Sequence, residues 1–158
     1  MEQKNKKYPF PQANDFNKIL LLLNIDNESL FNDKEYLKIY LDLGTERQIS
    51  YYLSAFQFLG FIDDEKKFTS YALDIKNQSY DIKILMLCRT IISLPVFGEV
   101  FFEKYLFNVD FSTDQIAQLI SIIYDIENYE VCKRRTSTVM RWLKWIEENK
   151  VNYNKLNE

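Results

Sequence analysis

The sequence predicts a mainly α-helical fold, in which a winged helix-turn-helix is followed by a second, degenerate helix-turn-helix-like unit. Only three glycines and three prolines interrupt 158 residues, and 47% of the chain is hydrophobic, enough for a sizeable core. Apolar residues recur at helical spacing in most segments. The elements follow the order helix, helix, turn, helix and hairpin, which is the order of a winged helix-turn-helix.

Four segments are expected along the chain. They are a flexible leader (1–12), the winged helix-turn-helix (13–78), a second helical unit (79–150) and a polar tail (151–158). The prolines of the leader favour an extended entry into the first helix. No apolar run follows the charged start of the leader, so we do not expect a signal peptide.

Each helix of the first unit starts at a residue that can cap it. The helices are expected at 15–24, 34–43 and 45–59, with caps at Asn14 or Asp15, at Asp33 and at Thr45. Thr45 with Gln48 three residues later matches a capping box. Gly60 ends the third helix, and two short strand-like runs, 61–63 and 67–69, form the predicted wing.

The second unit repeats the pattern without a clear wing. Its helices are expected at 80–93, at 96–106, after a cap at Ser112 or Thr113, and at 130–148. The apolar stretch 82–97 contains Lys83 and Arg89 and is stopped by Pro95. It is too short and too charged to span a bilayer, so it predicts a buried central helix.

Several classes of chemistry lack the residues they need. The chain has no His, which excludes Ser-His triads and metal sites that require imidazole. Its three scattered glycines cannot form a phosphate-binding loop or a dinucleotide fingerprint. Cys88 and Cys132 match no metal-ligand pattern and indicate reduced core thiols in a cytoplasmic protein. We therefore expect no metal, no cofactor and no catalytic residues.

The helix expected at 130–148 has the strongest functional pattern. From Val131 to Ile146 it holds five basic residues and no acid, in a chain of net charge −3. One stripe of this helix is apolar and contains Val139, Trp142, Leu143 and Ile146. The other stripe contains Lys133, Arg134, Ser137, Arg141 and Lys144. A cationic stripe on an acidic chain predicts contact with double-stranded DNA, and the alternative is a solvated outer face.

The helix expected at 45–59 is the candidate recognition helix. Opposite its apolar stripe lie residues suited to DNA contact, namely Arg47, Gln48, Ser50, Tyr51 and Ser54. Recognition helices read bases with their N-terminal residues. Arg47 can bind guanine through two hydrogen bonds, and Gln48 can bind adenine in the same way. The alternatives are a solvated face, and a Gln48 occupied as the capping-box partner.

The turn between the two strand-like runs allows one catalytic alternative. Glu65-Lys66-Lys67 fits the Glu-x-Lys signature of metal-dependent nucleases, with Asp42 or Asp63 as a second carboxylate. That chemistry needs both carboxylates and the lysine to converge on one metal ion. A short turn after a helix offers no sheet to hold them, so we prefer a solvated hairpin here.

Three segments together resemble a known family. They are Tyr8-Pro-Phe-Pro, residues 45–62 (TERQISYYLSAFQFLGFI) and residues 134–146 (RRTSTVMRWLKWI). Over residues 8–147 the chain is similar to the winged-helix module of bacterial restriction–modification and related defence proteins. This module occurs alone or attached to an endonuclease. The chain departs from it at Phe68-Thr69-Ser70-Tyr71-Ala72, which lacks the glycine usual there.

The resemblance implies a DNA-binding, non-catalytic role in a restriction–modification or phage-defence system. The alternative is a protein–protein interaction adapter within a defence complex, favoured by the acidic net charge and by the apolar surplus in 82–106. Exposure of Phe97, Phe101 and Phe102 would support the adapter. The sequence sets neither the DNA sequence recognised nor the oligomeric state.

Overall fold

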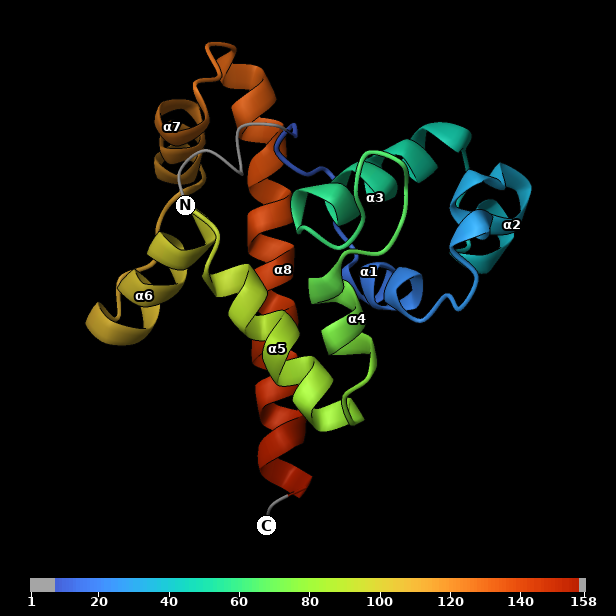
Figure 1. The fold of residues 1–158 in the computed structure, drawn as a ribbon. Helices are drawn as coiled ribbons and strands as arrows, with labels where there is room; N and C mark the ends of the chain where they lie inside the picture. Colours follow the sequence, from blue (N-terminus) through green and yellow to red (C-terminus); the bar gives the residue numbers. More distant parts are fainter. Residues whose placement is uncertain (1–7, 157–158) are drawn as a thin grey trace. The chain divides into compact units, whose positions relative to one another are not determined.

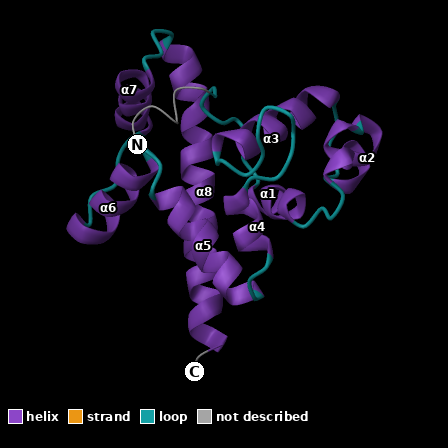
Figure 2. Ribbon diagram, in the orientation of Figure 1, coloured by secondary structure: helices purple, strands orange, loops and turns teal. Residues whose placement is uncertain are grey.

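The computed structural model describes residues 8–156, with side chains described through residue 150. The described chain forms eight α-helices and one short 3-10 helix, and no β-strand (Figure 1, Figure 2). It divides into two compact units, Met1–Ser79 and Tyr80–Glu158. The prediction of a mainly helical protein is confirmed in this coarse form, because the fold is all-α.

Every α-helix of the first unit begins at a capping side chain. The elements are α1 (Phe16–Leu23), the 3-10 helix η1 (Glu28–Asn32), α2 (Lys34–Tyr40), α3 (Glu46–Phe58) and α4 (Ser70–Lys76). The caps are Asp15, Asp33, Thr45 and Thr69, whose side chains accept a hydrogen bond from a first-turn N–H. The predicted capping box of α3 is only half formed, because Gln48 Oε1 accepts from the N–H of Gly44 at 2.9 Å rather than from Thr45.

The core of the first unit is an aromatic cluster drawn from several elements. Phe31 of η1 packs against Phe56 of α3, with ring centroids 5.8 Å apart. Phe56 also meets Phe61 edge-on at 5.2 Å, and Phe68 meets Phe31 edge-on at the same distance. Phe31, Phe56 and Phe61 are fully buried. Each such side chain contributes about 1.5–3 kcal/mol through its burial, so the cluster holds η1 and α3 together.

The predicted winged helix-turn-helix is wrong, because no wing forms in the described chain. The strand-like runs 61–63 and 67–69 make only one isolated antiparallel bridge, between Ile62 and Phe68. A wing needs a β-hairpin, and a single bridge is too short to be one. The second unit was predicted as a weaker repeat of that fold without a clear wing, so the predicted fold class is wrong as a whole. The described chain is all-α, and this unit consists of four helices.

The Asp63 side chain closes the turn between the two strand-like runs, and the Thr69 side chain caps the helix that follows them. One oxygen of the Asp63 carboxylate accepts from the N–H groups of Glu65 and Lys67, at 2.9 and 3.0 Å. The second run, 67–69, ends at Thr69, whose hydroxyl accepts from the N–H of Ala72 and caps α4. The chain therefore enters a helix before a β-ladder can extend.

The second unit is built around one long helix. Its elements are α5 (Tyr80–Ile92), α6 (Phe97–Phe107), α7 (Thr113–Tyr124) and α8 (Tyr129–Leu156). α7 runs beside the N-terminal half of α8, and α5 crosses α8 (Figure 1). At the centre of this core Trp142, 0% exposed, stacks on Phe97 with ring centroids 5.1 Å apart.

The bend between α5 and α6 requires a glycine. A Cβ atom on Gly98 would lie 2.4 Å from the carbonyl oxygen of Ile92, so only glycine allows this close approach.

No single helix among residues 8–156 is long and apolar enough to cross a membrane. α5 and α6 reach the necessary length and composition only as a pair, bent by 100° at the break between them.

The two ends of the chain are described only in part. Of the expected leader, residues 1–7 lie outside the described residues, and Phe10 is buried against Phe58 with ring centroids 5.9 Å apart. Of the expected tail, residues 157–158 lie outside the described residues, and α8 continues to Leu156.

Candidate functional site on helix α8

The α8 helix separates buried and exposed side chains into two faces. The buried face contains Cys132, Thr136, Thr138, Val139, Trp142, Trp145 and Ile146. The exposed face contains Lys133, Arg134, Ser137, Arg141 and Lys144, and this set of five is called the cationic face below. Helical periodicity therefore placed these five side chains at the surface correctly. Of the predicted apolar stripe only Leu143 is half-buried instead of buried.

The charges of the cationic face are mostly uncompensated. Among residues 8–150, no carboxylate lies within ion-pair distance of Lys133, Arg134 or Arg141. Lys144 lies 3.9 Å from Glu148, and both side chains are well exposed. An exposed pair of this kind contributes little and is screened by salt. The face thus keeps most of its positive charge for an external anion.

Of the hydroxyl groups in this part of α8, only that of Ser137 reaches the surface. Thr136 and Thr138 are buried. The Thr136 hydroxyl donates to the carbonyl of Lys133 at 2.7 Å, and the Ser137 hydroxyl donates to that of Arg134 at 2.9 Å. These bonds stay within the helix. Ser137 is therefore the one hydroxyl here that an external phosphate can approach.

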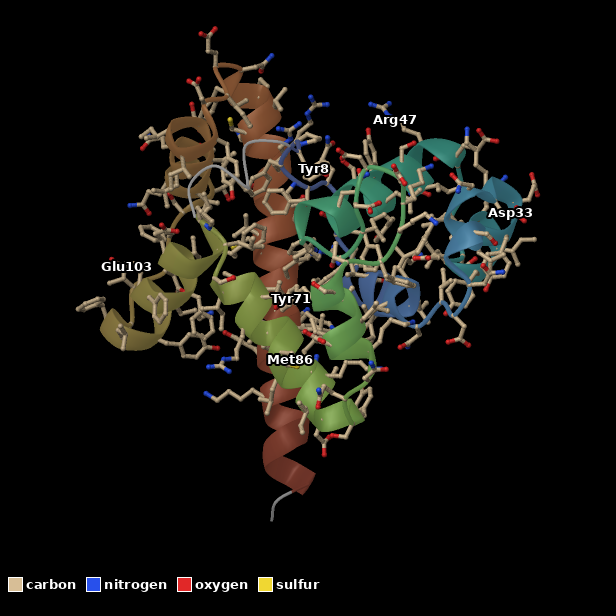
Figure 3. All side chains as sticks on the ribbon, in the orientation of Figure 1. Tyr8, Asp33, Arg47, Tyr71, Met86 and Glu103 are labelled. Carbon is tan, nitrogen blue, oxygen red and sulfur yellow. The ribbon has the colours of Figure 1, made fainter. Side chains whose placement is uncertain are left out.

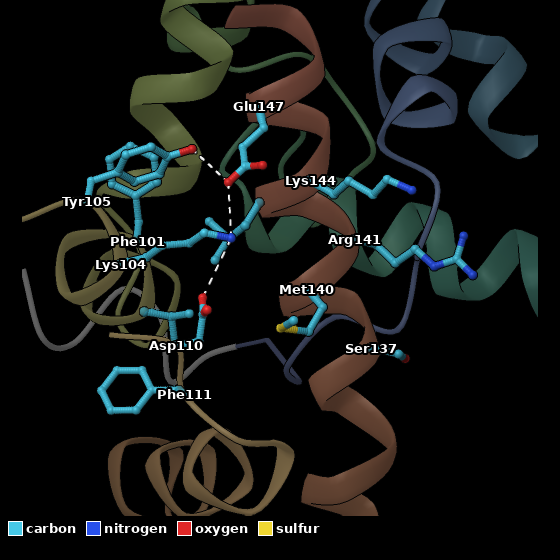
Figure 4. Close-up of a pocket in the computed structure, with 12 residues that line it drawn as sticks. Phe101, Lys104, Tyr105, Asp110, Phe111, Ser137, Met140, Arg141, Lys144 and Glu147 are labelled. Carbon is cyan, nitrogen blue, oxygen red and sulfur yellow. Dashed lines mark hydrogen bonds and ion pairs between the residues drawn. The ribbon is translucent and has the colours of Figure 1, made fainter. Parts of the chain in front are cut away.

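A groove of about 650 Å³ adjoins the cationic face within the second unit (Figure 4). It lies between α6, the loop before α7, and α8. Its apolar lining consists of Val100, Phe101, Phe111, Met140 and Leu143. Ser137, Arg141 and Lys144 of the cationic face form its edge along α8.

The polar side chains of the groove bond to one another. Lys104 Nζ lies 3.3 Å from Glu147 Oε1 and 3.7 Å from Asp110 Oδ1, and the Tyr105 hydroxyl donates to Glu147 at 2.7 Å. The hydrogen bond from Tyr105, followed by those from Lys104, holds the pKa of Glu147 below its usual value. Burial, followed by the bond to Glu147, raises the pKa of Tyr105 to about 12. Both shifts favour the states that these groups already have at neutral pH, an ionised Glu147 and a protonated Tyr105.

The predicted contact residues of α3 lie together on one side of the first unit. Arg47, Gln48 and Ser50 are exposed, whereas Tyr51 and Ser54 are half-buried. Arg47 extends outward from α3 (Figure 3), with its guanidinium carbon 5.5 Å from the centre of the Tyr51 ring. Gln48 uses its amide oxygen to accept from Gly44, as noted above. Because bidentate binding of adenine needs that oxygen, Arg47 is the better placed of the two for base contact.

The described chain assembles no obvious metal site. No group of three or more Cys, Asp or Glu among the described residues lies close enough to hold a metal ion. Asp63, the carboxylate considered for a nuclease site, closes the turn that contains Glu65. Cys88 and Cys132 are free thiols, and burial raises the pKa of Cys88 to about 11.

These features define an all-α protein of two small helical units, one of which presents a cationic helix face beside a groove. The chain belongs to the family described as a domain of unknown function, DUF7226, whose model matches residues 18–150. That match includes both α3 and the cationic face. No curated protein and no solved structure matches the chain.

The groove was not foreseen from the sequence. Its lining comes from α6, from the loop at Asp110 and Phe111, and from α8, which are distant along the chain. One signal was available in the sequence. Met140 on α8 is apolar but lies outside the apolar stripe of Val139, Trp142, Leu143 and Ile146.

Proposed function

We propose that this chain binds double-stranded DNA through the cationic face of α8 and has no reaction of its own. One observation carries the proposal. Lys133, Arg134 and Arg141 are exposed, and no described carboxylate lies within ion-pair distance of them. A chain of net charge −3 repels DNA overall, so it can bind the phosphate backbone only where positive charge is concentrated.

We further propose that the DNA-binding role belongs to a restriction–modification or phage-defence system. The similarity of residues 45–62 and 134–146 to modules of such proteins supports this assignment. An endonuclease or another component of a defence complex is the protein partner that it suggests. The cytoplasm is the location that fits, because the DNA is met there.

The face of α3 supplies base and backbone contacts in this proposal. Arg47 stands in the first turn of α3, where its planar guanidinium can bind two acceptors of one guanine. Gln48, Ser50, Tyr51 and Ser54 offer amide and hydroxyl groups suited to the surrounding phosphates. Phosphate contacts set the position of a protein on DNA, and base contacts such as that of Arg47 set its sequence preference.

The double variant Lys133→Ala/Arg134→Ala tests the proposal directly. Two lost phosphate contacts should flatten the slope of log affinity against log salt concentration by about 1.8, because each contact releases about 0.9 counterion. Affinity for duplexes of any sequence should fall together. The measurement is fluorescence anisotropy with a random-sequence duplex at several salt concentrations.

A matched control removes the same charges elsewhere. Lys38→Ala/Arg89→Ala also replaces one lysine and one arginine, on α2 and α5. It lowers the net charge equally but leaves the cationic face intact, so the salt slope should stay at the wild-type value. If the α8 variant and this control behave alike, the cationic face does not bind DNA.

A second candidate function, the protein–protein adapter, is favoured by the exposed apolar end of α6. Phe97 is buried and Phe101 is half-buried, but Phe102 is 49% exposed. Beyond it Leu106 and Phe107 are 69% and 66% exposed. Exposed aliphatic and phenyl groups close together favour contact with a protein.

A further inference from the structure

We propose that the groove between α6 and α8 binds an amphipathic helix of a partner protein. The apolar side chains of that helix enter the groove, and acidic residues line the flank that faces α8. The proposal rests on the adapter candidate and is independent of DNA binding. Four properties of the groove support it, namely its shape, its floor, its apolar end and its charged edge.

The shape of the groove suits a helix. It is bounded on one side by α6 and on the other by α8, where its edge runs from Ser137 to Glu147. This edge spans about ten residues of α8, which extend roughly 15 Å, or about three helical turns. A partner helix laid into such a groove presents side chains at positions i, i+3, i+4 and i+7.

The floor of the groove accepts apolar groups without leaving polar groups unpaired. Lys104, Asp110, Glu147 and the Tyr105 hydroxyl already bond to one another, so an occupant need not replace lost hydrogen bonds. Met140, 52% exposed, lies between this network and the α8 edge (Figure 4). Its flexible thioether side chain can adjust to the shape of an inserted residue.

Apolar surface continues from the end of the groove. Leu106, Phe107 and Val109 follow the α6 lining residues directly along the chain and are all exposed. Three exposed apolar side chains within four residues are more than the single exposed residues that are ordinary on protein surfaces. A helix with an apolar stripe would cover them.

The charge of the groove edge selects an acidic partner. Lys104, on the α6 side, lies within ion-pair distance of two carboxylates, Asp110 and Glu147, so these three side chains together carry a net charge of −1. On the α8 side, Arg141 and Lys144 line the groove with their stems, and their charged ends extend away from Phe101 and Tyr105 (Figure 4). The remaining positive charge of the groove lining therefore lies along α8, mainly at Arg141, because Lys144 lies 3.9 Å from Glu148. This edge is complementary to an acidic flank beside an apolar stripe.

The test uses the full chain and a synthetic peptide of about 14 residues, or four helical turns. The peptide carries leucines along one helical stripe and glutamates along one flank, with a fluorescent label. One control peptide has the same composition with the leucines scrambled. The other keeps the leucine stripe and replaces the glutamates with lysines. In fluorescence anisotropy the first peptide should bind about tenfold more tightly than either control.

Variants of the chain locate the binding site. Met140→Glu places a negative charge on the groove floor and should weaken the acidic peptide about tenfold or more. Met140→Leu should retain binding. Ile122→Glu is the matched control, because Ile122 of α7 is 77% exposed in the same unit and lies outside the groove lining.

The same measurements separate this proposal from the DNA proposal. Lys133→Ala/Arg134→Ala should leave peptide affinity unchanged, since neither side chain lines the groove. Met140→Glu should weaken peptide binding about tenfold or more whether or not the wild-type chain binds DNA. Failure of DNA binding alone therefore leaves the groove proposal intact, and failure of peptide binding alone leaves the DNA proposal intact.

The inference is overturned if the three peptides bind with equal affinity, or if Met140→Glu does not weaken binding of the acidic peptide. Self-association in sedimentation that Met140→Glu abolishes would also overturn it, and would assign the groove to a second copy of this chain. Binding to phosphatidylglycerol vesicles in place of the peptide would overturn it too, and would assign the groove to a lipid surface.

Discussion

Single side chains on α3 differ in what they can still bind. The amide oxygen of Gln48 is occupied by the N–H of Gly44, which helps to close the chain reversal before α3. Arg47 lies over the Tyr51 ring, a contact that orders the guanidinium and still leaves its edge directed outward (Figure 3). A pre-ordered arginine loses less entropy when it binds a base.

We therefore expect Arg47→Ala to change which DNA sequences are preferred, with a loss of about 1–3 kcal/mol at the position that Arg47 reads. Arg47→Lys should lose the same preference, because lysine retains the charge but not the planar pair of donors. Selection of bound duplexes from a randomised pool measures this. If both variants keep the wild-type preference, α3 does not read bases through Arg47.

Whole elements in this chain depend on their capping residues. Ser112 shows this most completely, since its hydroxyl accepts from the N–H of Gln115 at 3.2 Å and Gln115 Oε1 accepts from the N–H of Ser112 at 2.8 Å. This reciprocal capping box satisfies two donors at the start of α7. Thr69 caps α4 in the same position but without the return bond.

Replacement of Ser112 by Ala should lower the free energy of unfolding by about 1 kcal/mol, because one helix N–H loses its acceptor. Urea denaturation followed by circular dichroism measures the change. The control is Ser70→Ala, which removes an exposed hydroxyl at the first position of α4 and should stay within about 0.5 kcal/mol of wild type. Equal losses in both variants would mean that the capping box adds nothing to stability.

On the scale of the molecule, the chain has two cores. The first unit encloses the cluster of Phe31, Phe56 and Phe61, and the second encloses the stack of Phe97 and Trp142. Each core is made of side chains from its own unit. A cavity made in one core therefore acts first on the helices around it.

We expect Trp142→Ala to cost about 3–5 kcal/mol, because the side chain is fully buried and stacked. Hydrogen exchange should show the loss of protection in α5 to α8, with smaller changes in α1 to α3. Met140→Ala, on the exposed side of the same helix, should cost much less. A loss below about 1 kcal/mol for Trp142→Ala would contradict the packing described here.

The sequence by itself determined the features that depend on neighbouring residues. The helix starts at Asp33 and Thr45 were predicted correctly, and Asp15 is one of the two caps, Asn14 or Asp15, expected for the first helix. These predictions succeed because a cap acts on N–H groups only two or three residues away. The cationic face of α8 was also predicted correctly in its exposure, because a strongly amphipathic helix has one face that can be buried and one that cannot.

Only the tertiary structure decided whether the residues after α3 form a wing. Strand-like composition cannot show that the N–H of Phe68 donates to Glu28 Oε2 of η1 at 2.7 Å, across 40 positions of the sequence. Nor can it show that the pairing stops at one bridge, between Ile62 and Phe68. The extent of a β-ladder depends on which competing hydrogen bonds its residues make. The sequence allowed either a longer β-hairpin or a short paired turn followed by a helix. The structure forms the second, with Thr69 as the cap of α4.

The groove is likewise a product of tertiary structure. α6 is apolar on most sides, with Phe97 and Val100 buried and Phe102, Leu106 and Phe107 exposed, so its periodicity does not indicate which face enters the core. Packing against α5 and α8 determines which face of α6 is buried. It left apolar side chains of α6 beside those of α8, and no local pattern specifies a surface that two distant helices share.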